Sequence, residues 1–145
     1  MSKLLSRLFA DLPFPHPAEI PDVPITGIAI DSRKVQPGNL FVAMLGGSSD
    51  GHAFIPGAIR NGAAAIVGEQ DLSGLPVPYV RLESSRAALT YLAAAFHDHP
   101  GRKLTVIGVT GTDGKTTTTN LLYQILKTAG IQAGMVSTVN AAPPN

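Results

Sequence analysis

The sequence contains no cysteine and has few charged residues. Without cysteine, disulfides, thiolate metal sites and thiol nucleophiles are excluded within these 145 residues. Charged residues make up 14% of the chain and the formal net charge is +1, so there is no strong field to attract nucleic acid. No apolar run approaches the roughly 20 residues of a membrane-spanning helix, and residues 1–12 lack the continuous apolar core of a signal peptide. We therefore expect a soluble cytoplasmic protein with neither a nucleic-acid nor a membrane partner.

The apolar residues, 44% of the chain, are sufficient for a core. Near the N-terminus they follow helical spacing and predict a short helix that covers the core, with an apolar face made of Leu4, Leu5, Leu8, Phe9 and Leu12. Prolines are frequent between residues 13 and 24, and their fixed φ and missing N–H groups exclude helix and central strand there. Residues 1–24 should thus be a helix followed by extended coil.

Strand-like and helical patterns alternate between residues 25 and 100, which is typical of an α/β domain. Apolar runs predict strands at 25–30, 40–44, 63–67 and 77–80. Helical spacing predicts one helix over 54–59, capped by Asn61-Gly62, and a second that opens at Ser84. We place the domain boundary at residues 99–103, where Pro100-Gly101 closes that helix.

The remaining residues, 104–145, predict a second and incomplete unit. A buried strand at 104–109, a loop, a helix over 115–129 and a strand at 131–136 would form one βαβ unit. Two parallel strands and one helix leave a face of the sheet uncovered, so we expect this part to be loose or to self-associate.

The loop of this unit has the composition of a phosphate-binding site. It reads Gly108-Val109-Thr110-Gly111-Thr112-Asp113-Gly114-Lys115-Thr116-Thr117, between a predicted strand and a predicted helix. Unpaired N–H groups at a helix N-terminus bind phosphate oxygens, and glycine lets the backbone come close. Lys115 is placed to reach the β and γ phosphates, Thr116 to coordinate Mg²⁺, and Thr117 to assist. The predicted ATP-binding set is Gly111, Thr112, Asp113, Gly114, Lys115, Thr116 and Thr117.

The spacing differs from the strict Walker pattern, because five residues rather than four separate Gly108 from Gly114. This disfavours a plain GTPase or kinase. A glycine-rich turn followed by a helix cap with no ligand is the alternative interpretation.

The segment Gly-Thr-Asp-Gly-Lys-Thr-Thr resembles the ATP loop of the Mur ligases, which usually carries Asn where this chain has Asp113. A carboxylate near a triphosphate is repulsive, but aspartate also favours helix N-termini. We expect Asp113 to cap backbone N–H groups and to point away from phosphate.

A second resemblance to the same family covers residues 30–68. It rests on Asp31-Ser32-Arg33, Pro37-Gly38, Leu40-Phe41-Val42-Ala43, Asp50-Gly51-His52, Phe54-Ile55 and Gly62-Ala63. The resemblance implies that the uridine diphosphate end of the substrate contacts Ile30, Ser32, Gly47, Ser48 and Ser49. Taken alone, Asp31, Ser32 and Arg33 are also ordinary turn residues.

The resemblance implies a small N-terminal α/β UDP-binding domain at 25–100, followed at 104–145 by the start of a P-loop-type central domain. It implies ATP- and Mg²⁺-dependent amide formation through an acyl phosphate, with UDP-N-acetylmuramoyl-dipeptide and ATP as partners. The Gly-Val-Thr-Gly-Thr loop favours the branch that adds the third residue of the peptidoglycan stem over the branch that adds D-Ala-D-Ala. Catalytic residues of the family fall outside the sequence, so we expect none in this chain and no ligation by it alone.

Two alternatives from other classes stay open. The chain could be a non-catalytic UDP-sugar or nucleotide-binding module, or an unrelated P-loop phosphotransferase, although the latter does not explain residues 30–68.

For His52 we expect a hydrogen bond at a helix start rather than catalysis. His97-Asp98-His99 should be a solvated helix end and not a metal site, because sequence neighbours do not converge easily on one ion.

Overall fold

The computed structural model describes residues 2–46, 50–139 and 141–144. The chain divides into two compact units, residues 1–104 and 105–145, and each is described by itself. The assignment of these units to the domains predicted from the sequence stays a prediction.

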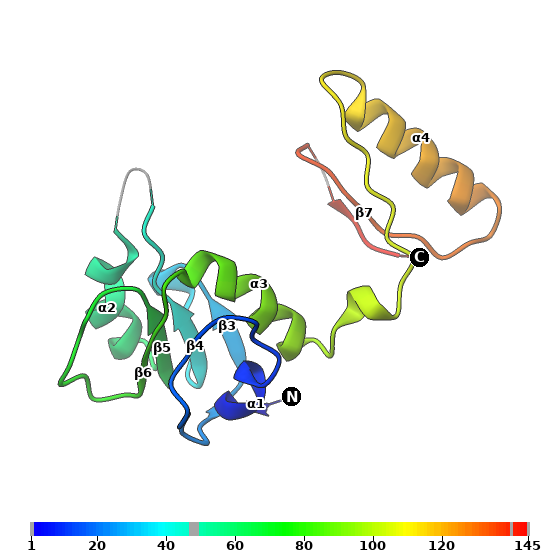
Figure 1. Ribbon diagram of the computed structural model, residues 1–145. Coiled ribbons are helices and arrows are strands. Elements are labelled where there is room, and N and C mark those ends of the chain that lie inside the picture. The colour runs from blue at the N-terminus through cyan, green and yellow to red at the C-terminus, as the bar shows by residue number, and fades with distance from the viewer. Residues whose placement is uncertain (1, 47–49, 140, 145) are drawn as a thin grey trace. The chain divides into compact units, whose positions relative to one another are not determined.

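The first unit is built around a parallel sheet (Figure 1). Its strands are β3 (Gly27–Ala29), β4 (Asn39–Val42), β5 (Ala65–Gly68) and β6 (Tyr79–Arg81), paired in the order 3-4-5-6. All residues of β4 and β5 are buried, which is the expected state of central strands covered on both faces. The α/β prediction is confirmed for this unit, and the sheet follows the four predicted apolar runs.

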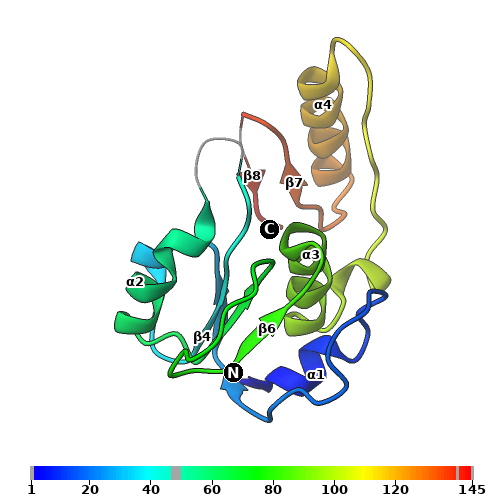
Figure 2. The same cartoon turned by 60° about the vertical axis from the view of Figure 1, so that its left-hand side comes forward.

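Helices cover both faces of the sheet (Figures 1 and 2). Helices α1 (Leu5–Phe9) and α3 (Ser85–Phe96) pack on one face, and α2 (Ile55–Arg60) lies on the other. Successive side chains of a strand point to opposite faces, so Leu40 and Val42 join the cluster with α1 and α3, while the intervening Phe41 joins the cluster with α2. One strand thus contributes to two cores.

The N-terminal segment is held at the edge of the core by a short ladder. Strand β1 (Lys3–Leu4) pairs antiparallel with β2 (Pro24–Ile25), and α1 follows at once. The predicted strand over 25–30 is therefore divided, because Ile25 pairs with β1 whereas residues 27–29 pair with β4. The predicted apolar face is confirmed at Leu5, Leu8, Phe9 and Leu12, whereas Leu4 is 38% exposed.

Local chemistry sets the ends of the helices and turns. The Ser84 hydroxyl accepts a hydrogen bond from the Ala87 N–H and caps α3 as predicted. Gly62 has φ of +94° after α2, the left-handed conformation expected of a C-terminal glycine. The described residues of the unit also form three 3₁₀ turns: η1 (Ser32–Lys34), η2 (Gly51–Phe54) and η3 (Pro100–Arg102).

The second unit consists of α4 (Lys115–Thr128) and an antiparallel pair of short strands, β7 (Met135–Val136) and β8 (Ala141–Ala142). The predicted helix is confirmed, but the strand predicted at 104–109 is not formed. A strand requires a hydrogen-bonded neighbour, and no described residue pairs with this stretch. Of the strand predicted at 131–136, only Met135 and Val136 have a hydrogen-bonded neighbour, and they form β7.

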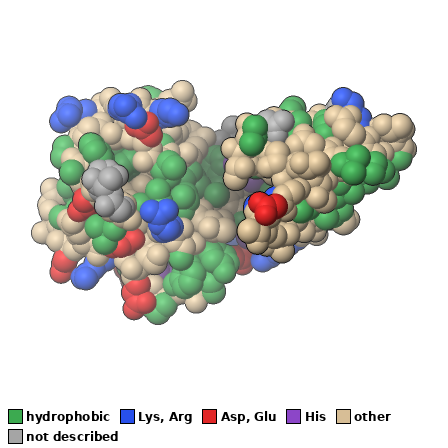
Figure 3. Space-filling model, turned by 90° about the horizontal axis from the view of Figure 1, so that it is seen from above, with side chains coloured by type: hydrophobic (Ala, Val, Ile, Leu, Met, Phe, Trp, Pro, Cys, Tyr) green, Lys and Arg blue, Asp and Glu red, His purple; other side chains and the backbone are tan. Residues whose placement is uncertain are grey.

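The second unit leaves much apolar surface in solvent, as the space-filling view shows (Figure 3). The exposed apolar side chains include Val106, Ile107, Leu121, Ile125, Val136 and Val139. Self-association of this part stays a prediction. Within the described ranges no helix combines the length and the apolar character needed to cross a membrane.

Candidate functional site

The phosphate-loop segment, residues 108–117, ends at the N-terminus of α4. Gly114 is the N-cap residue with φ of +74°, and Gly111 has φ of +146°, a region that favours glycine. The first hydrogen bond inside the helix runs from the Thr118 N–H to the Gly114 carbonyl at 2.9 Å. The N–H groups of residues 115–117 therefore lack an acceptor within the helix. Together with the helix dipole they can bind an anion.

The Lys115 side chain folds back onto this loop. Its Nζ donates to the carbonyl oxygens of Gly111 at 2.6 Å and of Thr112 at 2.9 Å. The ammonium is thus held against the loop backbone, next to the free N–H groups. This arrangement concentrates positive charge where a phosphate would be bound.

Asp113 does not cap the helix. The N-cap position belongs to Gly114, and no side-chain hydrogen bond caps α4. The capping expectation is therefore wrong: the chain places the carboxylate one residue before the cap, where it is exposed.

The backbone of the loop is open to solvent at two of its glycines. A Cβ atom built on Gly108 or on Gly114 would meet nothing within 4 Å, so the outer side of the loop is open. Thr116 lies in the first turn of α4, half-buried, and Thr117 beside it is exposed. Hydroxyl, ammonium and free N–H groups on one loop fit the donor set that such a ligand requires.

Of the residues predicted to contact UDP, the two that the structure describes lie at the carboxyl edge of the sheet of the first unit. Ile30, 56% exposed, directly follows β3, and Ser32 begins η1. Gly47, Ser48 and Ser49 lie outside the described residues, between the end of β4 and Asp50. Parallel sheets bind ligands beyond the carboxyl ends of their strands, so the described members of the set are placed where a ligand is expected.

Ser32 is fixed by its neighbours on both sides. The Asp31 side chain caps η1 and binds the Arg33 guanidinium, which holds the pKa of Asp31 at about 2, below its ordinary value. The side chain of Asn61, the C-cap residue of α2, donates to the Ser32 carbonyl at 2.8 Å. The turn interpretation and the ligand-contact prediction for this segment are compatible, because the turn presents Ser32 at the edge.

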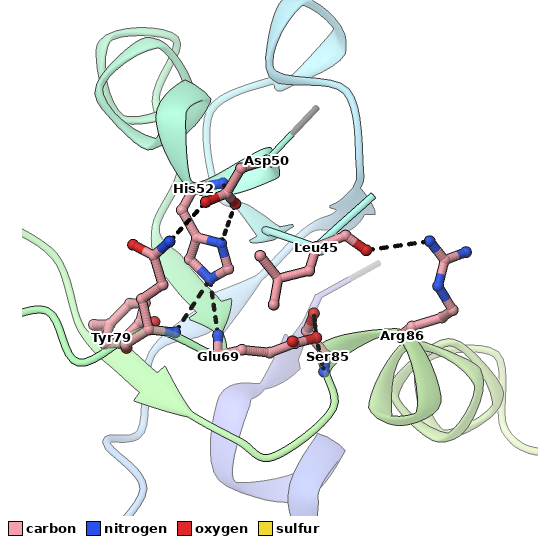
Figure 4. A network of polar contacts seen from close by, with 8 residues as sticks. Leu45, Asp50, His52, Glu69, Tyr79, Ser85 and Arg86 are labelled. Carbon is pink, nitrogen blue, oxygen red and sulfur yellow. Dashed lines mark hydrogen bonds and ion pairs between the residues drawn. The ribbon is translucent and has the colours of Figure 1, made fainter. Parts of the chain in front are cut away.

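Sequence reasoning missed a polar network at the same edge (Figure 4). The sequence predicts that His52 makes a hydrogen bond at a helix start, and its backbone N–H does donate to the Asp50 carboxylate at 2.9 Å. Its imidazole, however, is buried and binds Asp50 and the backbone of Glu69. The Asp-Gly-His triplet was visible in the sequence, but nothing local to it indicated that a strand end more than a dozen residues later would bind the ring.

The residues of the His97-Asp98-His99 segment have separate partners. Asp98 pairs with Lys3 at 2.5 Å and His99 with Asp11 at 2.9 Å. Across residues 2–46, 50–139 and 141–144, no three histidine or acidic side chains come together as metal ligands. The segment instead fastens the end of α3 to the N-terminal residues.

Comparison with known families gives a separate match for each of the two units. The family model described as "Mur ligase family, catalytic domain" matches residues 24–97, and the model described as "Mur ligase middle domain" matches residues 109–144. The chain belongs to the Mur ligase family.

Several Mur ligases are similar in sequence to much of the chain. The UDP-N-acetylmuramyl-tripeptide synthetase of Roseiflexus sp. is 50% identical over 86% of this chain and 25% of its own length. The synthetase of the same name from Deinococcus radiodurans is 45% identical over 97% of this chain and 30% of its own. The UDP-N-acetylmuramoyl-L-alanyl-D-glutamate–2,6-diaminopimelate ligase of Bacillus velezensis is 43% identical over 96% and 28%. The chain thus spans 25–30% of the length of these relatives.

Solved Mur ligase structures share the fold. MurF from Acinetobacter baumannii matches with a TM-score of 0.71 and 28% identity, over 88% of this chain and 28% of that one. MurF ligase from Thermotoga maritima, solved in complex with ADP, matches with a TM-score of 0.60 and 41% identity, over 70% of this chain and 23% of that one. A UDP-N-acetylmuramoyl-L-alanyl-D-glutamate–2,6-diaminopimelate ligase, at 22% identity and a TM-score of 0.70, is similar in fold.

Proposed function

We propose that this Mur ligase chain supplies the UDP-binding region and the ATP phosphate loop of a cytoplasmic enzyme of peptidoglycan synthesis. The reaction is the ATP-dependent addition of the third amino acid to UDP-N-acetylmuramoyl-L-alanyl-D-glutamate. Relatives that are 43–50% identical carry names for this step. The alternative within the family is addition of D-Ala-D-Ala, the activity in the names of some structural relatives.

The observation that carries the proposal is the loop of residues 111–117 at the N-terminus of α4. Free N–H groups, the Lys115 ammonium held at 2.6 and 2.9 Å from loop carbonyls, and the Thr116 hydroxyl occur together there. In the proposed reaction Lys115 and the loop N–H groups bind the β and γ phosphates of ATP. The Thr116 hydroxyl would hold a Mg²⁺ ion, which would neutralise phosphate charge.

The chemistry proposed for the whole enzyme is attack of a substrate carboxylate on the γ phosphate, which expels ADP and leaves an acyl phosphate. An amino group then attacks the acyl carbon, forms the amide bond and releases phosphate. Positive charge on the phosphate loop stabilises the charge on the transferring phosphoryl group. We assign no catalytic residue to this chain and propose that it binds ligands without completing ligation.

Calorimetric titration tests the two binding sites separately. The purified chain is titrated with UDP-N-acetylmuramoyl dipeptide and, in a second experiment, with Mg·ATP. We expect Ser32→Ala to weaken only the UDP ligand and Lys115→Met to weaken only ATP, by about tenfold or more for the lost charge-assisted hydrogen bonds. Lys127→Met, in the last turn of α4, is the matched charge control for Lys115.

The outcomes separate the candidate functions. Binding of the UDP ligand without ATP would favour a UDP-sugar-binding module, and absence of binding to both would reject the proposal. Turnover by the chain alone would contradict the proposal that it does not complete ligation.

A further inference from the structure

Helix α3 ends in a type of turn that most often contains glycine. The His99 N–H donates to the Ala94 carbonyl at 2.7 Å, and the Asp98 N–H donates to the Ala95 carbonyl at 3.3 Å. This pair of hydrogen bonds is the Schellman motif, in which glycine usually occupies the position of Asp98 because its φ is positive. Here Asp98 has φ of +58° and His99 has φ of +51°, a conformation that is unfavourable for residues with a Cβ atom. Contacts from elsewhere in the unit are needed to hold them in it.

Lys3 holds the first of these two residues. Its ammonium donates to the Asp98 carboxylate at 2.5 Å and to the Ala95 carbonyl at 2.7 Å. That carbonyl lies in the last turn of α3, at the negative end of the helix dipole. The side chain of Lys3 is only 17% exposed, and its hydrogen bond lowers the pKa of Asp98 below the ordinary value. Lys3 is itself fixed, because it lies in the ladder of β1 and β2.

Asp11 holds the second residue and the turn that follows. Its Oδ2 lies 2.9 Å from His99 Nε2 and 3.8 Å from Arg102 Nη1. Within the turn, the Arg102 N–H donates to the His99 carbonyl at 2.9 Å. The residues between α3 and the unit boundary at residue 104 are therefore tied to the chain on either side of α1, which packs beside α3 (Figures 1 and 2).

We propose that Lys3 and Asp11 form a clasp that controls the mobility of the linker, residues 98–104. The clasp consists of the contacts that these two side chains make with Asp98, His99 and Arg102. While it is closed, the chain stays bound to the first unit through η3. When it opens, the whole linker becomes free although the sheet stays folded, because ion pairs at a surface open at little cost. The N-terminal segment thus sets how much of the linker can move.

Trypsin tests the clasp in the full chain, because it cleaves after Arg102 and Lys103, which are both exposed in the linker. Cleavage follows the population of the open state when opening and closing are fast. We expect slow linker cleavage in the wild type. Lys3→Met should raise its rate about tenfold and Asp11→Ala about threefold, since the first change removes a charge-assisted hydrogen bond and the second a more exposed contact.

Cleavage elsewhere in the same digest separates linker opening from unfolding. Arg60 and Arg81 lie in α2 and β6, so cleavage after them reports loss of the sheet and its helices. The clasp predicts that the ratio of linker cleavage to this core cleavage rises in both variants. A merely structural role of Lys3 and Asp11 predicts that both rates rise together, and an unchanged ratio would overturn the inference.

Two variants outside the clasp are matched controls. Lys34→Met and Glu19→Ala each remove one exposed charge of the first unit, and both should leave the cleavage ratio at its wild-type value. A rise in the controls as large as in the clasp variants would show a general effect of charge and would overturn the inference.

A double-mutant cycle tests whether Lys3 acts through Asp98. Asp98→Gly keeps the turn, because glycine adopts a positive φ without strain, but removes the carboxylate. In this background Lys3→Met should raise linker cleavage by about threefold or less, because only the hydrogen bond to Ala95 remains to be lost. An equal, tenfold rise in both backgrounds would overturn the pairing.

Heteronuclear NOE measurements of the backbone amides test the clasp without a protease. In the wild type, residues 98 to 102 should be as rigid as α3, and Lys3→Met should lower their values while those of the sheet stay unchanged. Low values in the wild-type linker would overturn the inference. Neither experiment contains a ligand, so failure of the proposed UDP and ATP sites would leave this result unaffected.

Discussion

The guanidinium of Arg33 binds the carboxylate of Asp31 through two parallel hydrogen bonds, Nε to Oδ1 at 2.9 Å and Nη2 to Oδ2 at 2.8 Å. The Arg33 backbone N–H also donates to Oδ1, at 3.0 Å. The two residues thereby bind each other across Ser32. Among the predicted UDP contacts that carry a hydroxyl group, Ser32 is the one that lies within the described residues. Because these donors favour the charged carboxylate, the pKa of Asp31 is about 2.

We predict that Arg33→Gln raises the pKa of Asp31 toward its ordinary value, measured by carbon-13 NMR of the carboxyl group during acid titration. The pKa of folded Asp31 lies below that of the unfolded chain, so its stabilising effect is complete above about pH 4. The effect is lost as the pH falls through about 2. Lys34→Gln is the control, since Lys34 lowers the pKa of Asp31 only slightly compared with Arg33. An unchanged pKa in Arg33→Gln would contradict the role of the ion pair.

Replacing Asp113 by the usual family residue should improve ATP binding. Asp113 is exposed and does not cap α4, so in Asp113→Asn a like charge near the triphosphate disappears and no cap is lost. Calorimetry should show Mg·ATP affinity rising by roughly two- to tenfold, with weaker gains at high salt. Asp113→Ala should leave the thermal melting of α4 unchanged; a clear loss of helix stability would mean that this carboxylate caps the helix in solution.

Gly51→Ala should destabilise the first unit although the substitution is small. The added Cβ would lie 2.7 Å from both the backbone N and the carbonyl O of Met44, and backbone atoms cannot rotate away. We expect the free energy of unfolding, measured by urea denaturation, to fall by about 1–3 kcal/mol. Gly101→Ala adds a Cβ that meets nothing within 4 Å and should change stability by less than about 0.5 kcal/mol. Equal effects of the two changes would contradict the close approach at Met44.

Leu8→Ala should show that α1 belongs to the core of the first unit. Leu8 is 1% exposed and packs in the cluster that includes α3, so its truncation leaves a cavity. We expect a loss of about 2–5 kcal/mol in the free energy of unfolding. Leu121→Ala, at a position 61% exposed on α4, is the matched control and should cost much less. A small effect of Leu8→Ala would mean that α1 detaches readily from the sheet.

Much of the first unit could be predicted from the sequence because its signals are local. Buried parallel strands are continuous apolar runs, so the runs at 40–44 and 63–67 predicted β4 and β5. Caps are equally local, and Ser84 and Gly62 marked helix ends as predicted. The conformation of the loop before α4 is local as well, because the positive φ of Gly111 and Gly114 and the hydrogen bonds of Lys115 involve only near neighbours. Its binding of phosphate stays a prediction.

Other features depend on partners that are distant in sequence. The run at 104–109 has the apolar character of a strand, but a strand exists only with a hydrogen-bonded neighbour, and none of the described residues provides one. The strand predicted at 25–30 is divided because its beginning pairs with β1 and residues 27–29 pair with β4. Asp98 and His99, both with positive φ, are fastened to Lys3 and Asp11 from the other end of the unit.

By itself the sequence determined the α/β class of the first unit, the positions of its strands and helix ends, and the composition of the phosphate loop, since periodicity, caps and glycine act within a few residues. The tertiary structure alone decided which strands pair and how His52 is used. Burying its ring required Asp50 on one side and the end of β5 on the other. Such a buried polar group persists only where the fold brings both hydrogen-bond partners to it.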